Sequence, residues 1–215
     1  MEFKQERFIL CEGEHDKFFL ETLIEERQLG LFQIETAEGC TGIPGHDGFG
    51  PALYGFEPVI GFSDLKGIGI VTDNDNRQKL TNLVRRLRVH GYDPTPSAQV
   101  GNIYGKPVII ILIPDDKIYG NLERLCLPVL YDKWPGSEKC VEKYLECTGA
   151  NRWTNQNKIS KAIIRSAIAG YHKDDPLKGF HHLFQNKTFS ACHKCFDDLA
   201  DILKRFDAII AAGKF

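Results

Sequence analysis

The sequence predicts an α/β fold in which a mostly parallel sheet is flanked by helices and continued by a helical C-terminal extension. Over the first 132 residues, short apolar runs alternate with segments of helical periodicity, as in parallel strands joined by helices. The run 108–113 (Val-Ile-Ile-Ile-Leu-Ile) is apolar enough for a sheet interior. Beyond residue 132 nearly every predicted element is a helix. We therefore expect one domain over 1–132 and a helical extension, packed on it, over 133–215.

The individual elements follow from apolar spacing and from the Gly and Pro residues that interrupt it. Strands are predicted at 8–11, 32–36, 68–72 and 108–113. Helices are predicted at 16–28, 77–90, 121–131, 137–147, 156–170 and 191–209. Residues 42–61 are rich in Gly and Pro, which predicts a long loop with room for one short helix.

The composition is typical of a globular protein of a reducing compartment. Hydrophobic residues make up 42% of the chain and charged residues 26%. The seven cysteines are an odd number scattered over a long chain, which does not predict a disulfide framework. No apolar run approaches the roughly 18 residues of a membrane span, and the charged start does not resemble a signal peptide. We expect a cytoplasmic protein with no membrane segment.

Charge is distributed unevenly along the chain. Residues 1–132 carry 13 Lys and Arg against 20 Asp and Glu, a balance of −7, whereas residues 133–215 carry 14 against 9, a balance of +5. An acidic half joined to a basic half is what a metal site beside a surface for a polyanion would require. Random variation of surface charge would give the same numbers, so the asymmetry supports a function only together with specific residues.

Three predicted strands end in carboxylates. In chain order, the pairs are Glu12 and Asp16, Asp73 and Asp75, and Asp115 and Asp116. The carboxyl ends of parallel strands share one edge of a sheet, where ligands of such folds bind, so these side chains should converge. Converging carboxylates repel one another, and a hard cation such as Mg²⁺ removes that penalty. The pattern predicts a magnesium site suited to phosphoryl chemistry.

Each acidic position also has a purely structural explanation. Asp16 alone would serve as the cap of its helix, residues 73–76 as a turn, and Glu123 as a complement to a helix N-terminus. Taken singly, these explanations are the better ones. Three strand ends that all carry acid favour a shared site.

The spacing of these residues resembles that of a known family. The segment 11–20 (Cys-Glu-Gly-Glu-His-Asp-Lys-Phe-Phe-Leu) resembles the opening motif of TOPRIM domains, and 70–75 (Ile-Val-Thr-Asp-Asn-Asp) resembles their Asp-x-Asp motif. Gly120-Asn121-Leu122-Glu123 is similar to a Gly-x-x-Glu element of the branch that includes OLD-family nucleases. The resemblance covers roughly residues 6–130 and extends to uncharacterised stand-alone TOPRIM-like proteins.

This resemblance implies a TOPRIM-like fold, a chemistry and a set of roles. Glu12 would act as general acid/base or metal ligand, and Asp73 with Asp75 would hold Mg²⁺ or Mn²⁺. Asp16 and Glu123 would complete a second metal position, as the OLD-like branch suggests. The implied function is a magnesium-dependent enzyme that acts on nucleic-acid phosphodiester bonds, in particular a nuclease.

Two basic segments are candidates for binding nucleic acid. Residues 77–90 and 147–173 contain no Asp or Glu. In the second segment three cations fall at i, i+3 and i+7, on one helix face, while the isoleucines lie elsewhere around the helix. Such a stripe can contact phosphates without selecting a sequence. The candidate nucleic-acid-binding residues are Arg85, Arg86, Lys158, Lys161 and Arg165.

Other functions and partners stay open. The sequence contains no Walker A run, so we expect no ATPase activity of its own, and either a protein partner such as an ATPase or a homo-oligomer is compatible with it. A nucleotide-sugar transferase could use Asp73-x-Asp75 to hold a metal diphosphate, and it would have no need of Glu12. A third interpretation is a non-catalytic TOPRIM-like interaction module of a defence or repair assembly, which need not bind Mg²⁺.

The segment Cys192-His193-Lys194-Cys195 contains ligand types used by zinc sites. It lacks a second ligand pair at the spacing of such sites. The two cysteines also continue an apolar stripe through Phe196, Leu199 and Leu203. We therefore predict that both cysteines belong to the core side of helix 191–209, and that zinc is not bound.

Overall fold

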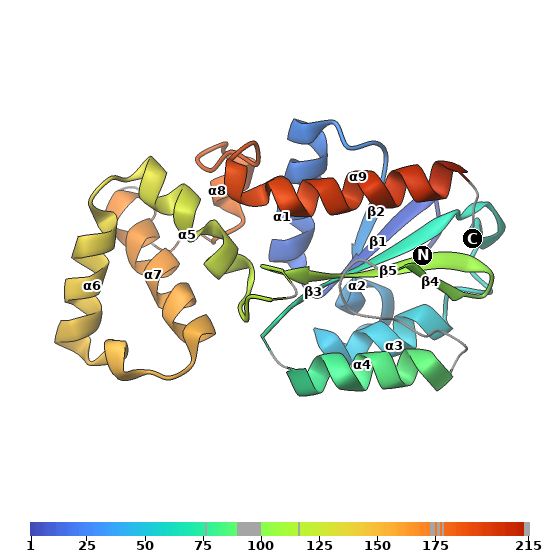
Figure 1. Ribbon diagram of the computed structural model, residues 1–215, viewed down its shortest axis with the longest axis horizontal. Helices are drawn as coiled ribbons and strands as arrows, with labels where there is room; N and C mark the ends of the chain where they lie inside the picture. Colours follow the sequence, from blue (N-terminus) through green and yellow to red (C-terminus); the bar gives the residue numbers. More distant parts are fainter. Residues whose placement is uncertain are drawn as a thin grey trace.

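A five-stranded sheet forms the centre of the fold (Figure 1). The computed structural model describes residues 1–75, 77–89, 100–115, 117–172, 175, 177 and 179–212. The strand order is β2-β1-β3-β5-β4; the first four strands are parallel, and β4 is antiparallel to β5. The strands are β1 (Arg7–Cys11), β2 (Gln33–Thr36), β3 (Gly67–Asp73), β4 (Val100–Ile103) and β5 (Lys106–Ile113).

Helices precede, join and follow these strands. The longer ones are α1 (Glu14–Arg27), α3 (His46–Tyr54), α4 (Arg77–Val89), α5 (Leu122–Lys133), α6 (Ser137–Thr148), α7 (Gln156–Tyr171) and α9 (Asp197–Ala212). Short segments are α2 (Ala37–Thr41), α8 (His182–Gln185) and the 3₁₀ turns η1 (Phe62–Asp64), η2 (Ala150–Arg152) and η3 (Lys194–Phe196). The mixed α/β fold with a mostly parallel sheet flanked by helices is the one that the sequence predicted.

One face of the sheet packs against the first and last long helices. Side chains alternate along a strand, so Ile9 and Cys11 of β1 point to the face covered by α1 and α9 (Figure 1). Buried residues of α9 include Leu203 and Phe206, and they belong to the same apolar cluster. The approach is close: a Cβ built on Gly67 of β3 would overlap the side chain of Ile210. The C-terminal helix is therefore part of the main core.

The other face packs against α3 and α4. Phe8 and Leu10 of β1 point to this side, where they join Phe49 of α3 and Leu83 of α4 in a second apolar cluster. Both faces are covered, which explains why the central strands β3 and β5 are mostly apolar.

A third, smaller apolar cluster joins α6 and α7. Val141, Leu145, Ala150 and Ile163 are its buried members. Figure 1 shows α6 and α7 side by side, beyond one end of the sheet. The inner side of α7 continues into the main core, because Ile164 and Ile168 belong to the cluster that contains β1 and α9. The extension predicted over 133–215 is thus helical, and it packs on the sheet unit.

Two predictions about local structure are wrong. The last helix begins at Asp197 and not at 191, and Cys192 is exposed while Cys195 is half-buried in η3. The side chain of His193 accepts a hydrogen bond from the backbone of Cys195, which starts a 3₁₀ turn in place of a regular helix. The short helix allowed for in the segment 42–61 is present as α3, whereas the strand β4 lies outside the predicted strands.

No helix in the part of the chain that the structure describes is both long enough and apolar enough to span a membrane.

Candidate functional site

The strand register brings the predicted acidic residues to one edge of the sheet. Cys11, the last residue of β1, pairs with Val71 of β3, and Asp73, the last residue of β3, pairs with Ile113 of β5. The carboxyl ends of these three strands are therefore aligned. Glu12 follows β1 directly and Asp73 ends β3, so both lie at this edge, where parallel sheets bind ligands.

Glu12 is held by the neighbouring strand. Its Oε1 accepts hydrogen bonds from the hydroxyl of Thr72 and from the backbone N–H of Asp73, the latter over 3.1 Å. These bonds cross from the end of β1 to the end of β3 and fix the carboxylate beside Asp73. Thr72 was not recognised as part of the site, because only the strand register shows that it faces Glu12.

Asp73 in turn contacts the start of α5. Its Oδ1 accepts a hydrogen bond of 3.1 Å from the backbone N–H of Leu122, the residue before Glu123. Asn74, next to Asp73, holds the connection between β5 and α5 at the end of β3. Its backbone carbonyl accepts a hydrogen bond of 2.9 Å from the N–H of Gly120, and its side-chain amide donates one of 2.9 Å to the carbonyl of Asp115. These contacts bring Glu123 to the same edge as Asp73.

Asp16 caps its helix, as one explanation from the sequence had it, and it also lies near the other acids. It occupies the first turn of α1, and its Oδ2 accepts a hydrogen bond of 3.1 Å from the backbone N–H of Gly13, which closes the N-terminal capping interaction. The same carboxylate lies within the electrostatic influence of Glu12 and Glu123. A capping function and membership of the acidic cluster are therefore compatible.

The carboxylates interact strongly with one another. Burial, followed by repulsion from Glu12 and Glu123, raises the pKa of Asp16 to about 7. The pKa of Asp73 is raised well above its ordinary value, first by burial and then by the carboxylates of the four other acids. Burial also raises the pKa of Glu123, to which Asp75 contributes. The five acids predicted as ligands, Glu12, Asp16, Asp73, Asp75 and Glu123, thus form one electrostatic cluster, called the acidic cluster below.

The donor set suits a hard cation, although the side chains do not form a closed cage. Across the described residues, no three His, Cys, Asp or Glu side chains are arranged to hold one metal ion together. Mg²⁺ commonly binds through one or two carboxylates and keeps several waters, so it does not require three protein ligands. Carboxylates whose pKa values are raised by mutual repulsion gain most from a cation placed between them. The residues therefore fit Mg²⁺ or Mn²⁺ by charge and by donor chemistry.

The acids that follow β5 behave differently from those that follow β1 and β3. Oδ1 of Asp115 accepts hydrogen bonds from the backbone N–H groups of Lys117 and Ile118, over 2.6 and 2.7 Å. Asp115 therefore stabilises a turn, which agrees with the frequent use of Asp in such positions. Asp116 lies outside the described residues.

The cations of α7 approach the acidic cluster from the helical extension. Lys161 and Arg165 line a cavity of about 410 Å³ together with Glu123 and His15. Lys161 lowers the pKa values of Asp16 and Glu123, against the larger effect of burial, so its charge acts on the cluster directly. Lys158 is exposed one turn earlier on the same helix. The prediction that one face of this helix carries the cations is confirmed.

The isoleucines of α7 lie elsewhere around the helix, as predicted. Ile163 and Ile164 are buried, and Ile159 is half-buried. Arg85, predicted together with these cations, lies on α4 and not on α7. Arg85 is exposed, and among the described residues it forms no ion pair with an acid of the cluster; the side chain of Arg86 lies outside the described residues.

A family model described as "Protein of unknown function (DUF3226)" matches residues 6–207 of the chain. The chain belongs to this family. The match begins just before β1 and ends within α9, so the sheet and the helical extension are parts of one family unit. No curated protein and no solved structure matches the chain.

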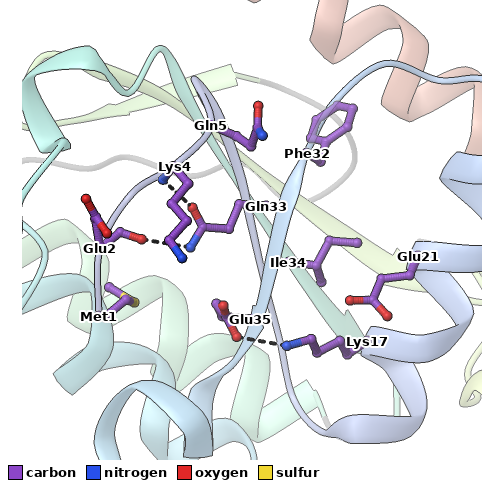
Figure 2. Close-up of a pocket in the computed structure, with 10 residues that line it drawn as sticks. All are labelled: Met1, Glu2, Lys4, Gln5, Lys17, Glu21, Phe32, Gln33, Ile34 and Glu35. Carbon is purple, nitrogen blue, oxygen red and sulfur yellow. Dashed lines mark hydrogen bonds and ion pairs between the residues drawn. The ribbon is translucent and has the colours of Figure 1, made fainter.

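Another hollow lies away from the acidic cluster, at the free side of β2. Its volume is about 720 Å³, and Figure 2 shows side chains from the first residues, α1 and β2 around it. Lys17 and Glu35 form an ion pair of 2.9 Å at its border, and Gln33 binds the backbone of Glu2 and Lys4. Both signs of charge are present and no member of the acidic cluster lines it. We assign no function to this hollow.

Proposed function

We propose that this protein is a Mg²⁺- or Mn²⁺-dependent enzyme that cleaves phosphodiester bonds of nucleic acid, a nuclease. The observation that carries the proposal is the acidic cluster itself, in which burial and repulsion from the neighbouring acids raise the pKa of Asp73. The ionised form of such a carboxylate is unfavourable without a nearby cation. Groups whose pKa is shifted in this way cluster at functional sites. The resemblance of segments 11–20 and 70–75 to TOPRIM motifs supports the same function.

The roles follow from position. Asp73 and Asp75 would hold the cation, and Glu12, fixed by two hydrogen bonds, would serve as general acid/base or as a further ligand. Asp16 and Glu123 would complete a second cation position. A bound Mg²⁺ ion would stabilise negative charge on the phosphate and promote formation of the attacking nucleophile.

A polyanionic substrate is supported by the surroundings of the acidic cluster. Lys161 and Arg165 line the cavity that also contains Glu123. Cations that face an acidic metal site across a cavity can hold the phosphates adjoining the one that reacts. A small neutral substrate would not require these two cations.

A cytoplasmic location and an assembly belong to the same proposal. All seven cysteines carry free thiols, which is the form expected in a reducing compartment. A nuclease of this kind would act together with a protein partner, such as an ATPase, or as a homo-oligomer.

The test combines cleavage with metal binding. The full chain is incubated with supercoiled plasmid, linear single-stranded DNA and RNA in the presence of Mg²⁺, Mn²⁺ or EDTA, and nicked or shortened products are separated on gels. We expect cleavage of at least one substrate with metal and none with EDTA. Titration of Mn²⁺ by calorimetry on the same sample measures binding. A protein that neither binds the metal nor cleaves any substrate would refute the proposal and favour an interaction module.

A further inference from the structure

A second cavity next to the acidic cluster combines aromatic rings with cations. Its volume is about 500 Å³, and its lining comes from α6, from α7 and from the turn that joins them. Two large aromatic side chains border it: Tyr144 is 51% exposed and Trp153 is 47% exposed. Lys158, Lys161 and Arg165 line it as well. We call this cavity the α6–α7 groove.

Buried apolar residues of α6, η2 and α7 lie beneath the groove. Leu145 of α6, Ala150 of η2 and Ile163 of α7 are buried in the small apolar cluster of this helix pair. The turn between the helices is also fixed, because Gly149 ends α6 in a left-handed conformation with φ 73° and Asn155 caps α7 through its side chain. The rings on the surface are thus presented by a rigid frame, as a binding site requires.

The two tryptophans differ in their ring contacts. The other tryptophan, Trp134, stacks against Tyr171 with ring centroids 4.4 Å apart and parallel planes, and it borders the main core. Among the ring pairs formed by the described residues, Trp153 takes part in none. A large, half-exposed indole ring that lines a cavity and pairs with no other described ring offers apolar surface to a flat ligand.

The charges of the groove select a polyanion. Its lining contains three cations and no Asp or Glu. Within the described part of the chain, none of these cations has a carboxylate at ion-pair distance. Lys161 and Arg165 also line the cavity that contains Glu123, so the two cavities share a wall. A chain of phosphates could pass from one cavity to the other along this face of α7.

We propose that the α6–α7 groove binds single-stranded nucleic acid, with an unpaired base stacked on Trp153 and the adjoining phosphates on the cations of α7. Aromatic side chains stack on bases whose faces are exposed, as in single strands, whereas the bases of a duplex already stack on their neighbours. Tyr144 supplies a second ring across the groove. The inference rests on the proposed function for one point, that the strand leads to the acidic cluster where it is cut; it adds the substrate class.

The experiment measures binding without cleavage. A fluorescently labelled oligothymidylate and a hairpin duplex with the same number of phosphates are titrated with the full chain in EDTA, and anisotropy gives the two dissociation constants. We expect the single strand to bind at least about 5-fold more tightly. Trp153→Ala should weaken single-strand binding by between about 5-fold and about 150-fold, the range of one base–aromatic stack, and leave duplex binding unchanged.

Matched variants separate stacking from folding. Trp153→Phe keeps an aromatic ring and should retain most of the single-strand affinity, and Tyr144→Ala should lower it. Tyr54→Ala removes a comparably exposed ring from α3, on the sheet unit, and should have no effect. Circular dichroism checks that each variant is folded. An oligonucleotide of the same length built from abasic sites should bind wild type and Trp153→Ala equally, because it offers phosphates and no bases.

The results also distinguish this inference from the proposed function. Equal or tighter binding of the duplex, an equal loss for both ligands in Trp153→Ala, or no binding at all would overturn the assignment of the groove, whatever cleavage shows. Trp153-dependent binding of single strands supports it even if no metal ever gives cleavage, and that combination would refute only the nuclease. Both measurements use the same full-length sample.

Discussion

The backbone N–H of Asp73 donates a hydrogen bond to Oε1 of Glu12 over 3.1 Å. The two residues are 61 positions apart, and the bond joins the ends of neighbouring parallel strands. It holds a carboxylate against the strand that supplies the next two acids, so the geometry of the acidic cluster depends on sheet pairing and not on a flexible loop.

Asp75→Asn should abolish metal-dependent cleavage while the protein stays folded. The substitution removes a charged ligand but keeps the shape of the side chain. Even supporting contacts of metal sites are worth about 10-fold to 100-fold, so we expect a loss of at least about 100-fold in rate. Cleavage gels and circular dichroism measure the two properties. Asp64→Asn, an exposed acid of η1, is the matched control and should cleave like wild type.

Stability without metal should fall as the pH rises from about 4 to about 7. The pKa of Asp16 is raised to about 7 from an ordinary value of 3.8. Between these values the folded protein keeps a proton that the unfolded chain has lost, so the free energy of unfolding decreases with pH, by at most about 1.4 kcal/mol per pH unit for this group. Urea unfolding in EDTA at several pH values measures the slope.

Asp16→Asn should flatten that slope and should make the metal-free protein more stable at pH 8 but not at pH 4. Asp198→Asn, an exposed acid of α9, should leave the slope unchanged. Added Mg²⁺ should stabilise wild type more at pH 8 than at pH 5, because the cation competes with protons for the same carboxylates. A stability profile that rises through this range would contradict the raised pKa.

Replacement of Lys158, Lys161 and Arg165 by Gln should weaken binding of nucleic acid and reduce its salt dependence. Each phosphate contact releases counterions and contributes roughly 0.7–0.9 to the slope of log affinity against log salt. We therefore expect the slope to fall by about two to three units, with no change in sequence preference. A control protein with Lys133, Lys187 and Lys204 changed to Gln loses as much charge elsewhere and should keep most of the slope.

Ile164→Ala should have the opposite effect. Ile164 is 1% exposed and belongs to the main core, so its truncation should lower the free energy of unfolding by about 2–5 kcal/mol. The salt slope of the folded variant should remain that of wild type. Together with the triple Gln protein, this variant tests whether the two sides of α7 have separate functions. A reduced slope in Ile164→Ala would indicate that the helix had shifted.

The strands were predictable from the apolar runs along the chain. The convergence of the acids was predictable because parallel strands end at one edge of the sheet. An apolar run as short and as β-branched as 108–113 favours a buried strand, and parallel strands place their carboxyl ends together. The bonds from Thr72 and Asp73 to Glu12 were not predictable, because they depend on strand register, which the spacing of residues in one strand does not give.

The errors have equally local causes. The apolar spacing that seemed to start a helix near residue 191 runs through Cys192, but the ring of His193 binds the backbone of Cys195 and sets a 3₁₀ turn first. The strand β4 was missed because its residues Val100–Ile103 are short and mixed in polarity, and only pairing with the apolar β5 makes them a strand.

Helix α9 is synthesised late, but it packs against strands that are synthesised early. Gly67 of β3 is in close contact with Ile210, so a strand made early is covered by a helix made last. While the ribosome is still adding the extension, the sheet face that α1 and α9 cover lacks the part of its cover that α9 supplies, and exposed apolar surfaces attract other chains or chaperones. In a fragment ending near residue 132, the part of the sheet that α9 covers would stay exposed to solvent. The apolar core on this side of the sheet is therefore complete only once α9 has been made.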